Sequence, residues 1–423
     1  MCVCPCVGGG RPVMEYLAQR RRAIWRWGLF MLLLSILLAG QSWITYRVFS
    51  SRFPGANDFA ARWSNGCALI WSGENPYSDQ ASLQTQKLIY GRPALPGEDL
   101  VAFSYPIYAL YFFWPLCCVQ PWPLVQAIWM TLMLYGVLAG TLLMMRVNRW
   151  KPLPWLLFLT LAWTVFNYPH ARAVLLGQMA TIVFVAVGLA LLALQKEADF
   201  WAGVALAAAT IKPQVAFLLL FWLLWWSAWQ RRWRVWWGFG LALALMGGVG
   251  LLLVPTWPAD FYRHVLNYDN VAAGPYHSLI WMVVRHTLGL GLTVEVLATS
   301  LFVVYLLWEW WRGRRASSEE LLWVTGLTLN LTNFISLRVA TTAYTLLLLP
   351  LFQLFRLGQR RVPKKAAGII VGVEGFLLLA QWMIFLFTVE DRFETAPVYL
   401  LLPIVLLIAQ LLTRTQFVAG ERP

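Results

Sequence analysis

Charged and polar side chains gather in a few short segments that separate long apolar runs of this 423-residue chain. They are Asp58, His170, Arg172, Gln178, Lys212, His264, Asp269, His277, Arg285 and Arg338. Ionisable groups near a membrane are costly, so their placement informs on function. A carboxylate, several cations and an apolar helical bundle together suit a substrate in which a phosphate group is attached to a lipid. Taken singly, each has a plainer role, because an Asp can cap a helix, a Lys can snorkel and an Arg can bind lipid headgroups.

The composition places these residues in a membrane protein. Hydrophobic residues make up 60% of the chain and charged residues only 12%, about half the charge of a soluble domain. Apolar runs such as 27–46 and 366–387 are long enough to cross a 30 Å hydrocarbon core as helices. We therefore expect an all-α integral membrane fold, since the backbone in lipid must satisfy its own hydrogen bonds.

The net charge of +14 is distributed by loop, which argues against nucleic acid as a partner. Most Lys and Arg lie in the tails and in alternate short loops, at 146–151, 196, 231–234, 312–315 and 356–365. This is the positive-inside pattern. It predicts a multi-pass protein of the cell membrane with both termini in the cytoplasm and the candidate site on the exterior face.

The apolar runs predict about 12 transmembrane helices in five segments. These are a cytoplasmic tail (1–26), a core of seven helices (27–254) with an exterior loop (47–121), a second exterior loop (255–291), five further helices (292–413) and a cytoplasmic tail (414–423). Residues 104–118 predict a juxtamembrane helix, and 63–73 an amphipathic one. Residues 201–229 predict two short helices that meet at Lys212-Pro213. An alternative topology with one crossing each for 104–119 and 201–229 places the basic 146–151 loop outside, so we prefer the first.

The six cysteines do not indicate a disulfide framework or a zinc site. Three lie in the first six residues, Cys117 and Cys118 lie in an apolar stretch, and Cys67 stands alone on the exterior side. The first apolar run has no small-residue cleavage signature, so we expect an uncleaved anchor.

Three classes of function stay open on the residues alone: a membrane enzyme, a transporter or flippase, and an assembly subunit. A transporter needs charges along the middle of the bundle, and Glu295 and Glu374 are the acids expected within helices. We find no inverted repeat and no phosphate-binding glycine loop. The long first exterior loop favours the enzyme.

Four motifs resemble a known family in the same order. They are NDFAARWSNGCALIWSGENPY (57–77), similar to an Asp followed by Gly-x-Asn-x-Tyr; FSYPIYALYFFWPL (103–116), similar to Phe-x-Tyr-Pro-Pro; LLGQMATIVFVAVGLALLAL (175–194), with Gly-Gln; and WAGVALAAATIKPQVAFLLL (201–220), with Ile-Lys-Pro. The chain resembles glycosyltransferase family 87, the polyprenol-phosphate-mannose-dependent mannosyltransferases of the GT-C fold. It departs at Ile107, at Tyr276-His277 and in SLRVATTAY (336–344), which leaves the sugar and the acceptor open.

The resemblance implies an inverting transfer of mannose from a polyprenyl phosphate to a hydroxyl of a lipid or glycan acceptor. Asp58 would be the general base. Lys212, Arg285, Arg338 and His277 would contact the donor phosphate, and Tyr77, Tyr105, Gln178 and His170 would bind substrate. We expect membrane lipid, donor and acceptor as partners, no nucleic acid and no cofactor. A divalent metal stays open, although acids near Asp58 are few and Glu98-Asp99 reads as a solvated turn.

Overall fold

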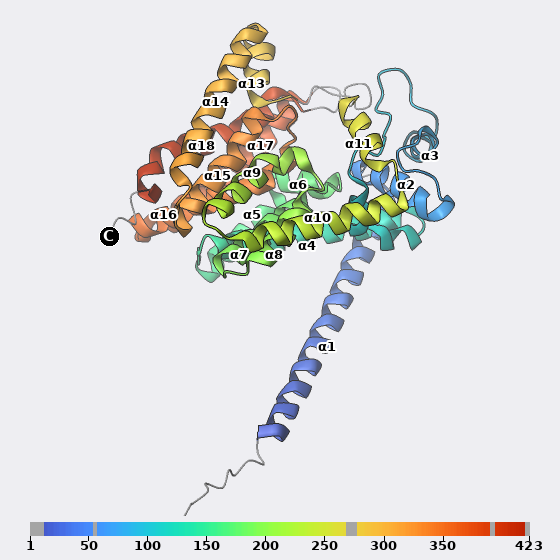
Figure 1. The fold of residues 1–423 in the computed structure, drawn as a ribbon, viewed down its shortest axis with the longest axis horizontal. Helices are drawn as coiled ribbons and strands as arrows, with labels where there is room; N and C mark the ends of the chain where they lie inside the picture. The colour runs from blue at the N-terminus through green and yellow to red at the C-terminus, as the bar shows by residue number, and fades with distance from the viewer. Residues whose placement is uncertain (1–11, 54–56, 268–276, 390–393, 419–423) are drawn as a thin grey trace, which may run out of the picture.

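The computed structural model describes residues 12–53, 57–267, 277–389 and 394–418. Within them every regular element is a helix. The first, α1 (Pro12–Thr45), continues into the π-helix η1 (Tyr46–Ser50) and runs away from the other helices, as Figure 1 shows. The chain is therefore all-α, as its apolar runs predict.

Among the described residues, six helices are long and apolar enough to cross a membrane. They are 20–50 and α4 (Trp122–Val147), α10 (Trp233–Leu253), α14 (Leu292–Gly313), α17 (Pro363–Thr388) and α18 (Ala396–Val418). The bent pair α6 (Tyr168–Leu175) and α7 (Ala180–Gln195) makes a seventh if it is one span. The predicted count of about 12 is not confirmed, because α5 (Pro154–Phe166), α8 (Asp199–Ala209) and α9 (Pro213–Trp229) are shorter apolar helices. The five-segment division of the chain stays a prediction.

The segment that the sequence predicts to be the first exterior one folds into α2 (Asn57–Ser72), α3 (Asp79–Tyr90) and two 3₁₀ helices, η2 (Ile107–Phe112) and η3 (Trp114–Cys118). The single juxtamembrane helix predicted for 104–118 is thus wrong. Pro115 lies in the first turn of η3, and Phe113 separates the two elements. The apolar face of α2 is buried in protein: Phe59 stacks on Trp129 of α4, with ring centroids 3.9 Å apart.

The chain breaks at Asn167, between α5 and α6. Asn167 takes an extended backbone conformation, and Pro169 in the first turn of α6 suits a helix start. A second break follows at Gly177, whose φ of +66° favours glycine. The chain bends by 119° there before α7.

The predicted break at Lys212-Pro213 is present between α8 and α9. Helix α8 packs closely on α10, because Gly203 and Gly238 face the partner backbone and a Cβ on either would collide with it. The end of α8 is anchored by a 2.9 Å hydrogen bond between the Tyr108 hydroxyl and Thr210 Oγ1. These contacts hold the Lys212 turn against η2.

Past α10 the chain forms α11 (Trp257–Leu266), and from residue 279 it forms α13 (Leu279–Trp281) and η4 (Met282–Thr287), which lead into α14. The remaining helices are α15 (Ser318–Ile335), η5 (Thr341–Leu347), α16 (Leu348–Arg361), α17 and α18. In Figure 1, α11 lies beside α2 and α3, whereas α13 and α14 rise on the other side of the molecule. Asp269 lies outside the described residues.

Candidate functional site

One carboxamide joins the two residues on which the predicted chemistry depends. Gln178 Nε2 donates to Asp58 Oδ2, and Lys212 Nζ donates to Gln178 Oε1 over 2.6 Å. These three residues lie 34 and 120 positions apart along the chain. The folding of α2, the Gly177 turn and the α8–α9 break therefore builds one polar site.

The two ends of this bridge differ in exposure. The side chain of Asp58, in the first turn of α2, is 37% exposed. Lys212, which precedes α9, is 5% exposed. A hydroxyl group from solvent can reach the carboxylate, whereas the ammonium group lies deep in the protein.

Burial and, to a smaller extent, the nearby guanidinium of Arg62 lower the pKa of Lys212, the Asp58 carboxylate opposes them, and the net result is a pKa of about 8. Lys212 lies in the turn between two short helices, outside the segments long enough to span a membrane. An ammonium group held in low dielectric interacts more strongly with an anion than the same group in water. Near neutral pH this turn therefore offers a buried cation.

Arg62 is a component of the site that the sequence analysis missed. It lies one helical turn after Asp58, with its Nη1 3.8 Å from Asp58 Oδ1. Its guanidinium lies 4.9 Å from the centroid of the Tyr105 ring. The i, i+4 spacing on a helix could have revealed this ion pair. Only the tertiary structure showed that the Tyr105 ring lies against this guanidinium.

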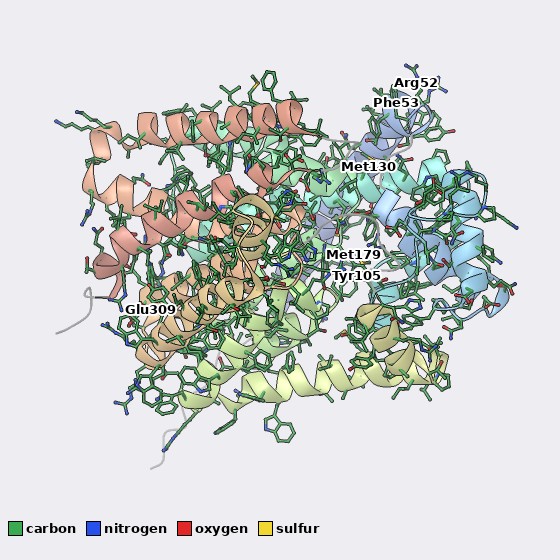
Figure 2. All side chains as sticks on the ribbon, turned by 90° about the horizontal axis from the view of Figure 1, so that it is seen from above. Arg52, Phe53, Tyr105, Met130, Met179 and Glu309 are labelled. Carbon is green, nitrogen blue, oxygen red and sulfur yellow. A yellow bond between two sulfur atoms is a disulfide. The ribbon has the colours of Figure 1, made fainter. Side chains whose placement is uncertain are left out.

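Tyr77 and Tyr105, predicted to bind substrate, are buried and contact each other. The Tyr77 hydroxyl donates to the Tyr105 carbonyl oxygen over 2.6 Å, and Tyr105 is 4% exposed. Tyr105 is labelled in Figure 2. Tyr77 thus holds the backbone of Tyr105, whose ring packs against Arg62.

Asp99 does not lie in the solvated turn that the sequence suggested for Glu98-Asp99. Its Oδ1 accepts the Val101 amide over 2.7 Å, and burial raises the pKa of Asp99, with Arg62 and Asp58 acting on it as neighbouring charges. Glu98 pairs instead with Arg92 at 2.7 Å, which lowers the pKa of Glu98 to about 2. A second carboxyl group therefore interacts electrostatically with the Asp58–Arg62 pair.

Arg338 belongs to a segment that contacts the first turn of α9. Ser336 Oγ donates to the carbonyl oxygens of Gln214, at 3.3 Å, and of Arg338, at 3.1 Å. Gln214 lies two residues after Lys212. The backbone of Arg338 therefore lies near the first turn of α9, which directly follows Lys212 in the chain.

His170 is packed in the protein interior rather than joined to the bridge. It is 1% exposed, lies beside Trp163 and Phe184, and has Nδ1 3.4 Å from Asn167 Nδ2. Its role in substrate binding stays a prediction.

Arg172, from the same helix, contacts the buried Glu394, with Nη1 3.2 Å from Oε1. Glu394 also accepts hydrogen bonds from Tyr168 and Tyr399. This pair joins α6 to the start of α18 and holds the helices together.

Arg285 and His277 lie in a different part of the structure. Arg285, in η4, pairs with Glu295 at 3.6 Å, and His277 lies over Trp281 with ring centroids 3.8 Å apart. Among the contacts of the described residues, none joins these two side chains to Asp58 or Lys212. Their contact with a donor phosphate stays a prediction.

The intramembrane acids considered for a transport path are each engaged separately. Glu295 faces Arg285, and Glu374 accepts a 2.7 Å hydrogen bond from Thr160. Within the described part of the chain, no three His, Cys, Asp or Glu residues are grouped so as to hold a metal ion.

A disulfide joins Cys67 of α2 to Cys117 of η3, 50 residues apart. The expectation that Cys67 stands alone is wrong, because the two cysteines meet only once the first exterior segment folds. Trp63 and Trp71 reinforce the link by donating to the carbonyl oxygens of Leu116 and Cys117, at 3.0 and 2.8 Å. The helix that carries Asp58 is thereby fixed to η3.

Residues 103–336 match the model of glycosyltransferase family 87, which is more than half of the chain. The matched region contains Tyr105, Gln178 and Lys212, and it begins after Asp58 and Tyr77. No curated protein matches the chain. The contacts just described connect the matched region to α2, and on the strength of the match this chain belongs to glycosyltransferase family 87.

Proposed function

We propose that this membrane glycosyltransferase moves mannose from a polyprenyl-phosphate donor to a hydroxyl of a lipid or glycan acceptor, on the exterior face of the membrane and with inversion. The observation that carries the proposal is the Gln178 carboxamide between Asp58 and Lys212. It places a solvent-accessible carboxylate and a buried cation at the two ends of one polar group. A transfer from a phosphate leaving group needs such a pair.

The proposed reaction uses the Asp58 carboxylate and the Lys212 ammonium group at the two ends of the Gln178 side chain. Asp58 takes the proton of the acceptor hydroxyl as its oxygen forms a bond to the anomeric carbon. The bond between that carbon and the phosphate oxygen breaks, and its electron pair leaves with the lipid phosphate. Lys212 stabilises the charge that develops on this phosphate. Attack opposite the leaving group inverts the anomeric centre.

Two contacts support the assignment of Asp58 as base. Asp58 pairs with Arg62 and accepts a hydrogen bond from Gln178 at Oδ2. The Gln178 amide also fixes its orientation. Positioned base catalysis typically contributes about 10²- to 10⁴-fold to a rate.

Two features support the exterior face. Disulfides persist in oxidising compartments, and Cys67–Cys117 lies on the same helix as Asp58. The basic loops at 146–151 and 231–234 belong to the opposite ends of α4 and α9 from η3 and Lys212.

The experiment compares the wild-type chain with Asp58→Asn in nanodiscs. Each is incubated with radiolabelled polyprenyl-phosphate-mannose and a lipid extract from the source cells. We expect label in a new product with wild type, a loss of about 10²-fold or more in Asp58→Asn, and equal donor binding by both. Asp79→Asn, on the exposed first turn of α3, is the matched control and should act as wild type.

Retained transfer in Asp58→Asn would refute the base assignment. If both proteins fail to transfer label and instead carry labelled lipid across a sealed bilayer equally well, the protein is a flippase.

A further inference from the structure

The helix α11, which follows α10 at the second exterior segment, is joined to the Tyr77 turn by a buried carboxylate. Asp260 is 9% exposed and its Oδ2 accepts from Asn75 Nδ2 over 3.0 Å and from Thr256 Oγ1 over 2.7 Å. Asn75 and Asp260 lie 185 positions apart in the chain. Nothing in the proposed chemistry uses this pair directly.

Asn75 connects Asp260 to the turn that follows Asn75 in the chain. With its amide nitrogen held by Asp260, its Oδ1 accepts the Tyr77 amide over 3.0 Å. A second residue of α11 contacts the same tyrosine, because the His264 ring meets the Tyr77 ring edge-on at 5.6 Å. His264 Nδ1 also lies 3.3 Å from the Phe103 carbonyl oxygen. Two side chains of α11 thus hold Tyr77 from one side.

Through its hydroxyl group, Tyr77 is connected to the candidate base by way of Tyr105 and Arg62. Its hydroxyl donates to the carbonyl oxygen of Tyr105, the Tyr105 ring lies beneath Arg62, and Arg62 pairs with Asp58. A continuous line of packed and hydrogen-bonded groups therefore runs from α11 to the carboxylate.

We propose that Asp260 is a positioning residue, which sets the place of Asp58 through Asn75, Tyr77, Tyr105 and Arg62. The inference rests on the proposed role of Asp58 as base. An interaction of this kind acts on the rate of transfer, since a displacement of about 1 Å at a reacting group can cost about 10² in rate. It should act little on donor binding, because Lys212 is held by different contacts, with Gln178 and the α8–α9 turn.

The geometry allows a test by exchange of the two partners. Asn75→Asp sets two carboxylates against each other and should lower the rate at saturating donor about 10- to 100-fold. Asp260→Asn can still accept from Asn75 and from Thr256, so it should keep at least a third of the rate. The double variant Asn75→Asp with Asp260→Asn restores a donor and an acceptor in reversed order, and we expect its rate within about threefold of wild type. Gln80→Glu, which adds a carboxylate at an exposed position of α3, is the control for added charge.

The rates are measured with radiolabelled polyprenyl-phosphate-mannose and the cell lipid extract, per mole of monodisperse protein, at several donor concentrations. A loss in the maximal rate at an unchanged half-saturating donor concentration, rescued by the exchange, supports positioning. A role in folding alone would lower the thermal midpoint and leave the rate per folded molecule unchanged, which would overturn the inference. Failure of the double variant to recover would also overturn it.

Hydrogen–deuterium exchange separates this inference from the proposed function. In Asn75→Asp, the amides of residues 58–66, 75 and 77 should exchange faster than in wild type, and the double variant should restore protection. If wild type transfers no label but this pattern is present, the proposed function fails and the connection from α11 to α2 stands. If Asp58→Asn abolishes transfer and Asn75→Asp changes neither rate nor exchange, the inference about Asp260 fails by itself.

Discussion

Replacing Lys212 by methionine removes the charge of a buried ammonium group while keeping the length of the side chain. Lys212 is 5% exposed, and its contact with Gln178 Oε1 would extend to a donor phosphate bound beside it. A hydrogen bond to a charged group contributes about 1.5–3 kcal/mol. Because about 1.4 kcal/mol corresponds to a factor of ten, donor binding at pH 7 should weaken roughly 10- to 100-fold.

The pH dependence gives this prediction a second, independent part. Burial penalises the charged form and lowers the pKa of Lys212 to about 8. The protonated form therefore predominates below pH 8 and is lost as the pH rises above it. In the wild type, donor affinity should be constant from about pH 6.5 to 8 and then fall about tenfold per pH unit, since the free enzyme must be protonated to bind. Lys212→Met should show no such break.

The assay is equilibrium binding of polyprenyl-phosphate-mannose in nanodiscs between pH 6.5 and 9.5, without acceptor. The donor is a phosphodiester, so its own charge is constant over this range. Lys87→Met, at an exposed position of α3, is the matched control and should bind as wild type. The reasoning is refuted if Lys212→Met binds donor within about threefold of wild type at pH 7, or if it keeps a break near pH 8.

Two further predictions concern the groups that hold the site. Gln178→Leu removes the hydrogen-bond donor to Asp58 and the acceptor for Lys212. It should lower the transfer rate about tenfold or more and also weaken donor binding, because unpaired buried polar groups cost about 1–3 kcal/mol each. Unchanged transfer kinetics would contradict the role of Gln178 as a bridge. Replacing both Cys67 and Cys117 by serine opens a link across 50 residues, for which the chain-entropy relation gives about 4 kcal/mol. We expect the thermal midpoint in detergent to fall, and reductant to lower it in wild type but not in the double variant. Alkylation of Cys67 and Cys117 themselves in non-reduced wild type, located by peptide mass spectrometry, would show that the link is absent.

The sequence predicted the elements that carry the site better than it predicted the number of transmembrane spans. Apolar runs locate most of the helices, and Pro213 marks the break that places Lys212 between α8 and α9. The predicted count of about 12 spans is not confirmed, because an apolar run has the same sequence pattern whether its helix faces lipid or protein. The short helices α5, α8 and α9 are examples.

Other features could not be read from local pattern. The disulfide pairs Cys67 with a cysteine that looked like part of an apolar stretch, and Asp99 looked like a solvated turn residue, yet its carboxyl group is affected by burial and by the charge of Arg62. Arg285 and Arg338 were equivalent as sequence candidates. The structure places Arg338 in a segment against α9 and pairs Arg285 with Glu295. Each of these outcomes depends on contacts between distant segments.

By itself, the sequence determined that the chain is a helical membrane protein, because hydrophobicity and the need to satisfy backbone hydrogen bonds act through composition and local runs. It also supplied the residue types, an aspartate at a helix start and a lysine before a proline, that suit transfer from a lipid phosphate. Only the tertiary structure decided that Gln178 lies between Asp58 and Lys212, and that Asp260 reaches Asn75. Hydrogen bonds act over about 3 Å, and side chains 34 to 185 positions apart come that close only when the whole chain has folded.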